Sequence, residues 1–268
     1  MRILIIGSSG FIGAHLVRAA VASQMEVVTL SRKGDCRHGA MIGYQWEMGR
    51  TIPQAACAGV DCAIHLAHDF EGAHGAQRTL DATIAITKEL HAAGVPRQLF
   101  FSSYSSGEHA SSVYGRTKYA IEEAIGNIAG VVIVRPGLVL GEGGLYGRIR
   151  KWARILPVIP LPDGGQGCVP VIQIEMLGDV TLQLAMSPSA PSEANLFEMQ
   201  LRSLRQLVLD AAAERQRKPW ILPIPTRWLS GMLLAAARLR IRLPVNADNL
   251  AGFMSNQSAT HTSTLHKV

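Results

Sequence analysis

Short apolar runs alternate with segments of helical spacing along the first half of the chain. The runs at residues 2–6, 26–30, 62–67, 98–102 and 131–134 read as strands. The segments at residues 11–22, 75–93 and 114–127 carry apolar side chains at helical intervals, and the second of these stops at Gly94 and Pro96. This β–α–β rhythm predicts a parallel sheet with helices on both of its faces.

The rhythm weakens after Pro136. Residues 137–170 are rich in Gly and Pro, and we expect loops and short pieces around a ligand cleft. Helices are expected near residues 177–186 and over residues 203–218, where Ser203 is the predicted cap. Residues 219–225 read as a connector. Residues 255–268 are polar and rich in Ser and Thr, and we expect them to be frayed.

Composition and charge place the chain among globular α/β proteins. Its 268 residues are 48% hydrophobic and 17% charged, which suits one large domain or a domain with a smaller lobe. A net charge of +6 favours anionic partners such as phosphorylated small molecules, acidic membranes or nucleic acid. No long Lys/Arg run with interleaved aromatics occurs, so nucleic acid is not expected. Basic residues are modestly concentrated over residues 202–242.

Cysteine and histidine positions argue for a reducing compartment and against a metal. The four cysteines contain no C-x-x-C pair and read as reduced thiols. We treat His65, His68 and His74 as an incidental cluster and predict no metal site. Nothing resembles a signal peptide, and the apolar segment 228–239 is too short to cross a bilayer. That segment predicts an amphipathic or buried helix, with contact to a membrane surface as the lesser alternative. The expected location is cytoplasmic.

Three glycines follow the first predicted strand and open the first helix, in the stretch GSSGFIG. Gly7 would allow a tight turn, Gly10 would let a pyrophosphate approach the backbone, and Gly13 would let helix and strand pack closely. The helix N-terminus would supply free N–H groups to the phosphates. The alternative is a glycine-rich turn that serves packing alone.

The end of the second strand bears on the choice of dinucleotide. The stretch VVTLSRKG has no carboxylate to accept hydrogen bonds from the adenosine ribose, whereas Ser31 and Arg32 could hold a 2′-phosphate. We therefore expect NADP as the cofactor, with NAD possible. A solvated basic turn is the alternative.

The stretch FFSSYSSGEHASSVYGRTK carries the candidate chemistry. Tyr114 and Lys118 are four residues apart on a predicted helix, so they share one face. The Lys118 ammonium would pull the pKa of Tyr114 down from about 10 and make the phenol a general acid/base. Ser103, at the end of the preceding strand, would hydrogen-bond the substrate oxygen. The adjacent Ser102 is the second choice for this serine.

Taken together, these motifs give a specific resemblance. GSSGFIG, VDCAIHLAH, FFSS, YGRTK and IVRPGLVLG occur in this order over residues 1–145, and the chain resembles an extended short-chain dehydrogenase/reductase of the NAD-dependent epimerase/dehydratase family. The resemblance implies a Rossmann-type, doubly wound parallel sheet with a small C-terminal substrate lobe. It implies a dinucleotide-binding domain over residues 1–145, a substrate lobe over 146–254, partly interleaved with the sheet, and a flexible tail over 255–268.

The resemblance also assigns residues. It implies catalytic roles for Ser103, Tyr114 and Lys118. It implies cofactor contacts along the glycine loop, at later strand ends and at the catalytic pair: Gly7, Ser9, Gly10, Phe11, Ile12, Gly13, Leu66, Ala67, Tyr114, Lys118 and Pro136.

The C-terminal third matches more faintly. Glu175 stands for an acidic residue of the family, while Gln173 stands where a His is usual. Arg148, Arg150 and Arg154 could face a diphosphate, and a solvated basic helix is the alternative. Tyr114 follows Ser103 by 11 positions, a shorter gap than in typical nucleotide-sugar epimerases, so the pocket between them is expected to differ.

Two functions remain open at this point. The first is an NAD(P)-dependent oxidoreductase, epimerase or dehydratase that moves a hydride to or from a carbonyl or alcohol carbon of a nucleotide-linked sugar. The second is a dinucleotide-binding structural or regulatory protein without turnover. Apolar surface on the helices over residues 75–93 and 114–127 is consistent with a homodimer.

Overall fold

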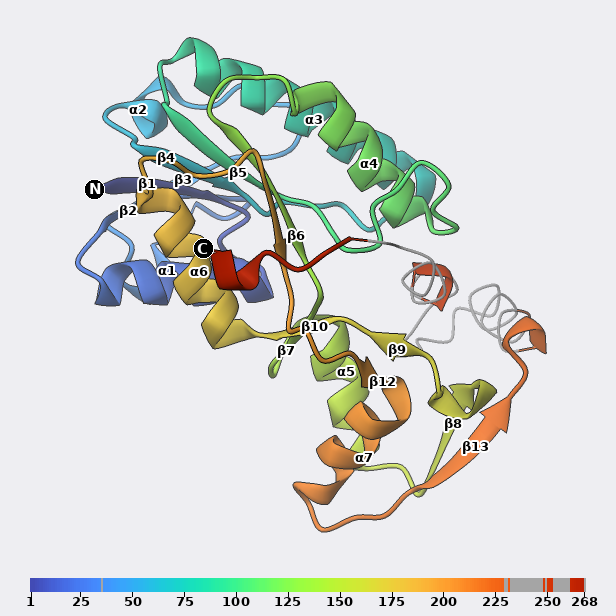
Figure 1. Cartoon of the computed structure of the whole chain (residues 1–268). Helices are drawn as coiled ribbons and strands as arrows, with labels where there is room; N and C mark the ends of the chain where they lie inside the picture. The colour runs from blue at the N-terminus through green and yellow to red at the C-terminus, as the bar shows by residue number, and fades with distance from the viewer. Residues whose placement is uncertain (35, 229–230, 232–247, 249, 253–260, 268) are drawn as a thin grey trace.

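The structure is a computed structural model of the chain (Figure 1), and it describes residues 1–34, 36–228, 231, 248, 250–252 and 261–267. The predicted helix over residues 228–239 lies outside the described residues, apart from Trp228 and Gly231. No helix of the described part is both long and apolar enough to cross a bilayer.

A seven-stranded sheet with the order β11-β6-β5-β4-β1-β2-β3 forms the centre of the molecule. Every neighbouring pair in it is parallel. Its strands are β1 (Arg2–Ile6), β2 (Glu26–Ser31), β3 (Ile42–Gln45), β4 (Cys62–His65), β5 (Arg97–Phe101), β6 (Val131–Pro136) and β11 (Glu193–Leu196). This is the doubly wound Rossmann topology that the sequence predicts, and the point where the strand order reverses lies between β1 and β4.

Helices cover both faces of this sheet because alternate residues of each strand point to opposite sides. Ile3 and Ile5 of β1 pack in the layer of α1 (Phe11–Ala22) and α6 (Ile174–Met186). Leu4 and Ile6 pack in the opposite layer, where α3 (Gly72–Ala92) lies beside α4 (Val113–Ile125). The predicted helices 11–22, 75–93 and 114–127 are therefore confirmed to within a few residues.

A smaller lobe is built from the segments after β6. It contains α5 (Gly144–Ala153) and α7 (Leu204–Ala213), which contact one another, and three two-stranded sheets. These sheets pair β7 (Leu138–Leu140) with β10 (Val171–Gln173), β9 (Cys168–Val169) with β12 (Arg202–Ser203), and β8 (Val158–Pro162) with β13 (Trp220–Ile224). Short 3₁₀ turns complete the fold: η1 (Arg37–Gly39), η2 (Asp163–Gly165) and η3 (Leu265–Lys267), with the single-turn helix α2 (Gln54–Cys57).

Three local expectations are wrong. Residues 137–170 contain a full helix, α5, and not only loops and short pieces, since only its first residues are glycines. The expected connector at 219–225 is strand β13, which pairs in parallel with β8. The expected helix over 203–218 ends at Ala213, although Ser203 does cap it by accepting a hydrogen bond from the Gln206 N–H at 3.1 Å.

The C-terminal segment 261–267 is not frayed. Thr264 pairs with Asn195 of the edge strand β11. The Thr264 N–H donates to the Asn195 carbonyl at 2.9 Å. The Ser263 hydroxyl donates to the Phe197 carbonyl at 2.5 Å. Polar composition suggested a flexible tail, but these side chains satisfy the backbone of an otherwise open sheet edge.

Candidate active site

The glycine loop connects β1 to α1 at the carboxyl edge of the sheet. Gly7 has φ +88°, and a Cβ added there would lie 2.7 Å from the backbone nitrogen of Ala67. A Cβ on Gly13 would lie 2.4 Å from the Gly7 carbonyl oxygen. Gly7 and Gly13 are therefore glycines because the protein itself leaves no room for a side chain.

Gly10 differs from these two glycines. A Cβ on Gly10 would meet a single protein atom, the Gly7 carbonyl oxygen, at 3.3 Å. Gly10 is exposed and is the N-cap of α1, where no side chain caps the helix. Packing within the protein therefore gives little reason for a glycine at position 10. An open, uncapped N-terminus of a 12-residue helix fits a pyrophosphate.

The remaining predicted loop and strand-end residues have varied surroundings. Ser9 is exposed, and the ring of Phe11 lies against the backbone of Gly141 and Gly143, towards the lobe. Leu66 and Ala67 follow β4 and abut Gly7. Pro136 ends β6, and its carbonyl accepts a hydrogen bond from the Tyr104 N–H at 3.1 Å.

Two exposed cations, Arg32 and Lys33, follow the end of β2. The Ser31 hydroxyl is buried and accepts a hydrogen bond from the Gly34 N–H at 3.1 Å, which closes the turn after the strand. Arg32 is exposed beside it. Of the predicted pair, Ser31 thus has a local structural partner, and Arg32 is the residue available to a phosphate.

Ser103, Tyr114 and Lys118 lie together at the carboxyl end of β5. The hydroxyl of Ser103 lies 2.9 Å from the Ser105 hydroxyl and is close enough to the Tyr114 phenol to oppose the rise in its pKa. The Lys118 Nζ lies 5.7 Å from the centre of the Tyr114 ring and donates to the Phe101 carbonyl at 2.6 Å. Gly115 lets helix α4 lie close to the loop that contains Ser105, because a Cβ at position 115 would lie 2.4 Å from the Ser105 carbonyl oxygen.

Ser102 has a different partner. Its hydroxyl donates to the carboxylate of Glu122, which also accepts from Arg135 at 2.6 Å. Arg135 in turn pairs with Glu193 at 2.6 Å, so this ion network ties β6, α4 and β11 together. Of the two adjacent serines, the geometry therefore joins Ser103 and not Ser102 to Tyr114.

The pKa values of Tyr114 and Lys118 differ from the prediction. Burial raises the pKa of Tyr114 to about 12, and the hydrogen bond from Ser103 opposes this only in part. Burial lowers the pKa of Lys118 to about 7, with Glu122 opposing. The expected depression of the Tyr114 pKa is thus wrong for this structure, because the phenol loses solvation on burial and its pKa rises.

Three contacts of the tyrosine were not predicted. The His68 and Tyr114 rings meet edge to face at 4.9 Å, and the Phe70 ring stacks on Tyr114 at 6.1 Å. The Asp248 carboxylate accepts from the Val113 N–H at 2.6 Å and from the Tyr114 N–H at 3.3 Å. His68 and Phe70 follow the strand-end residue Ala67, which was a usable signal, whereas Asp248 is too distant in sequence for any pattern to find.

The predicted diphosphate contacts have acidic partners within the chain. Arg150 forms ion pairs with Glu142 at 3.1 Å and Glu214 at 2.7 Å, and Arg154 pairs with the same Glu214. Arg150 lines a cleft of about 540 Å³ between the start of α1 and the lobe, together with Glu175 and Gln173. The cations on α5 that face Glu214 are thus already neutralised, and Arg148 is left exposed.

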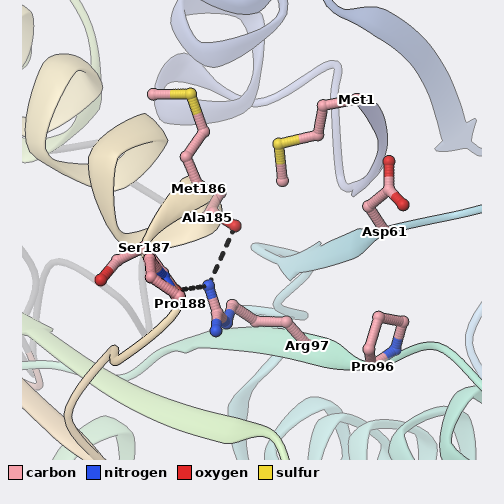
Figure 2. Close-up of a pocket in the computed structure, with 8 residues that line it drawn as sticks. All are labelled: Met1, Asp61, Pro96, Arg97, Ala185, Met186, Ser187 and Pro188. Atoms are coloured by element: carbon pink, nitrogen blue, oxygen red, sulfur yellow. Dashed lines mark hydrogen bonds between the residues drawn. The ribbon is translucent and has the colours of Figure 1, made fainter.

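A second cavity lies far from these residues. Figure 2 shows it at the amino ends of the strands, between Met1, Asp61 and Arg97 and the end of α6. Arg97 donates to the carbonyls of Leu184 and Ala185 at 3.1 Å and so closes the C-terminus of α6. Ligands of parallel sheets bind at the carboxyl ends, so we assign this cavity a structural role.

Comparison with known proteins agrees with the fold. The chain is similar to three solved structures: MoeE5 in complex with UDP-glucuronic acid and NAD (TM-score 0.71, 18% identity, 84% of this chain and 86% of that one), the NAD-dependent NDP-hexosamine 5,6-dehydratase TunA (0.66, 21%, 96% and 96%), and UDP-glucose 4-epimerase of Thermotoga maritima with UDP-glucose (0.68, 17%, 97% and 98%). At sequence identities of 17–21%, this structural similarity establishes a shared fold and nothing more. A search of the curated proteins gave no match.

Family membership rests on the sequence. Residues 3–157, more than half of the chain, match the model of the NAD-dependent epimerase/dehydratase family. The matched span includes the glycine loop, Ser103, Tyr114 and Lys118. The chain belongs to the NAD-dependent epimerase/dehydratase family.

Proposed function

We propose that this protein is an NAD(P)-dependent oxidoreductase, epimerase or dehydratase acting on a nucleotide-linked sugar. The observation that carries the proposal is the convergence of Ser103, Tyr114 and Lys118 at the carboxyl edge of a doubly wound sheet, where the Lys118 Nζ lies 5.7 Å from the centre of the Tyr114 ring. The nucleotide-sugar ligands of MoeE5 and of the T. maritima epimerase, which share the fold, support this substrate class.

The cofactor supplies or accepts the hydride, and the chain's own residues handle the proton and the oxygen. Tyr114, with a pKa of about 12, is protonated at neutral pH and is poised to donate its proton to a substrate carbonyl oxygen. Ser103 orients that oxygen with a second hydrogen bond. Lys118 stabilises the phenolate left after proton donation, because the negative charge on the phenolate favours the protonated form of the nearby amine, whose pKa is about 7.

We further propose that residues 1–145 bind the dinucleotide, that residues 146–254 bind the substrate, and that the glycine loop and Pro136 line the cofactor site. The fit of Gly10 and the uncapped α1 N-terminus to a pyrophosphate supports this assignment. A panel of nucleotide-linked keto- and hydroxy-sugars, assayed for nicotinamide oxidation and for epimerised or dehydrated product, tests the reaction. Consumption of none of them by protein that binds the cofactor would contradict it.

We also propose that NADP is preferred over NAD. Exposed Arg32 directly follows β2, where an acidic residue would bind an adenosine ribose, and an arginine there suits a 2′-phosphate. Paired fluorescence titrations with NADPH and NADH test this, with Arg32→Ala and the matched control Lys88→Ala on α3. We expect NADPH to bind more tightly and Arg32→Ala alone to remove the difference. Equal binding of both cofactors by the unmodified protein would refute the preference.

A non-catalytic dinucleotide-binding protein is the second candidate. The observation in its favour is that the rings of His68 and Phe70 contact the Tyr114 ring, so that its phenol is only partly exposed in this structure. A scaffold should function equally well with phenylalanine at position 114, whereas the enzyme should not. An intact Ser103–Tyr114–Lys118 set favours the enzyme, because a scaffold has no use for it.

A further inference from the structure

The β8–β13 ribbon has two faces of very different burial. On the inner face, Ile159 and Leu161 are 8% and 5% exposed and pack against α5 and α7. The outer face is formed by residues that pair across the two strands, Trp220 with Val158 and Leu222 with Pro160. Trp220 is 80% exposed, Leu222 49% and Val158 44%. Figure 1 shows the ribbon at the edge of the lobe farthest from the seven-stranded sheet.

An apolar sheet face of this kind usually covers or contacts something. Trp228, 65% exposed, follows the ribbon after a short turn in which its N–H donates to the Pro225 carbonyl at 2.9 Å. Two tryptophans therefore lie on exposed parts of one short segment. Tryptophan is the residue most characteristic of the boundary between lipid chains and water, because its ring is apolar and its N–H is polar.

The charges beside this face are mostly positive. Arg215, Arg217 and Lys218 precede Trp220, Arg227 precedes Trp228, and all four are exposed. The sequence from 215 to 228 contains no acidic residue. Within the described part of the chain, none of these four cations forms an ion pair. The nearby carboxylate of Asp163 is engaged by Thr226, whose hydroxyl donates to it at 2.6 Å.

We propose that the outer face of the β8–β13 ribbon and its flanking cations form a docking surface for an anionic lipid bilayer. Trp220, Leu222 and Val158 would enter the interfacial region, and Arg217, Lys218 and Arg227 would contact lipid phosphates. A second copy of the chain fits less well, since two such faces would bring like charges together. Nucleic acid would leave the apolar side chains without a partner. The inference does not depend on the proposed enzymatic function.

Co-sedimentation with vesicles tests the proposal, using phosphatidylcholine alone and phosphatidylcholine mixed with phosphatidylglycerol. We expect the unmodified protein to bind only the anionic vesicles and to be released by salt. Replacing Trp220 and Leu222 by serine should weaken binding by about tenfold or more. Replacing Arg217 and Lys218 by glutamine should weaken it by about fivefold for each charge.

The matched controls lie on the other part of the molecule. Met41→Ser removes a 62% exposed apolar side chain next to β3, and Lys88→Gln removes an exposed cation of α3; both should bind as the unmodified protein does. Equal binding to neutral vesicles, no binding to anionic ones, or undiminished binding by the Trp220/Leu222 variant would each overturn the proposal. So would a dimer in solution that the same variant dissociates. The salt and lipid dependence of the unmodified protein decides the matter even where a variant does not fold.

Discussion

The His68 ring lies edge-on against the Tyr114 ring, with centroids 4.9 Å apart and planes at 76°. The Nδ1 atom of His68 is buried and has no hydrogen-bond partner among the described residues. Burial lowers the pKa of His68 to about 3, with Lys118 adding to the effect, so the imidazole is neutral at working pH. The histidine therefore covers the tyrosine as an uncharged ring.

Removing this ring should make Tyr114 easier to ionise. His68→Ala would admit water to the phenol, and because burial is the main cause of its raised pKa, that pKa should fall from about 12 by roughly one unit. Ultraviolet difference titration, with Tyr114→Phe as the reference that identifies the signal, measures the shift. An unchanged tyrosine titration in His68→Ala would show that His68 does not control the hydration of Tyr114.

Ser103 and Ser102 should behave differently when each is replaced by alanine. Ser103→Ala removes the hydroxyl beside Tyr114 and should lower kcat by about 10²-fold while leaving stability nearly unchanged. Ser102→Ala removes a donor to buried Glu122 and should cost about 1 kcal/mol of stability with little loss of activity. Steady-state kinetics and urea unfolding of both variants check this. The reverse pattern would exchange the roles of the two serines.

Lys118 should make the protein more stable as the pH rises. Its pKa is about 7 when folded and 10.5 when exposed, so between these values the unfolded chain binds more protons. Below pH 7, both states are charged and the cost of burying the ammonium is fully present. Above that pH, stability should rise by up to about 1.4 kcal/mol per pH unit. Urea unfolding between neutral and alkaline pH should show this slope in the unmodified protein, and Lys118→Met should lack it. Equal slopes in the two proteins would contradict the lowered pKa.

Alanine substitutions at Gly13 and Gly10 should affect different properties, stability in the first case and dinucleotide binding in the second. Gly13→Ala places a Cβ 2.4 Å from the Gly7 carbonyl oxygen and should destabilise the protein by about 1–3 kcal/mol. Gly10→Ala meets only one contact at 3.3 Å, so the chain should fold normally but bind dinucleotide more weakly. Thermal unfolding and cofactor titration of each variant provide the two readouts. Normal cofactor affinity in Gly10→Ala would mean that the pyrophosphate does not pass this residue.

The sequence predicts the sheet well because the relevant signals are local. Apolar strands β1, β2, β4, β5 and β6 are continuous runs, as buried parallel strands must be. The short strands β3 and β11 were not predicted, since IGYQ and EANL lack such runs and lie near the sheet edge. Strand β13 was missed because Pro223 within it and the prolines on either side of it read as loop, although a parallel pairing at the margin of the lobe tolerates Pro223.

The residues of the candidate site could be predicted from the sequence, but their pKa values and ion-pair partners could not. Spacing alone brings Tyr114 and Lys118 onto one helical face, and strand-end position brings Ser103 to them. The raised pKa of Tyr114 comes from burial, and the rings that contact it, His68 and Phe70, come from another strand end. The shared partner of Arg150 and Arg154 could not be predicted either, because Glu214, at the C-terminus of α7, lies some sixty residues away in the sequence.

The most direct test of the account is hydride transfer by Tyr114→Phe, measured together with cofactor binding in the same preparation. The protein should oxidise or reduce nicotinamide dinucleotide with a nucleotide-linked sugar, and the variant should lose this activity by about 10²–10⁴-fold while binding the cofactor as before. Full turnover by Tyr114→Phe would contradict the central claim that Tyr114 exchanges the proton of the reacting oxygen.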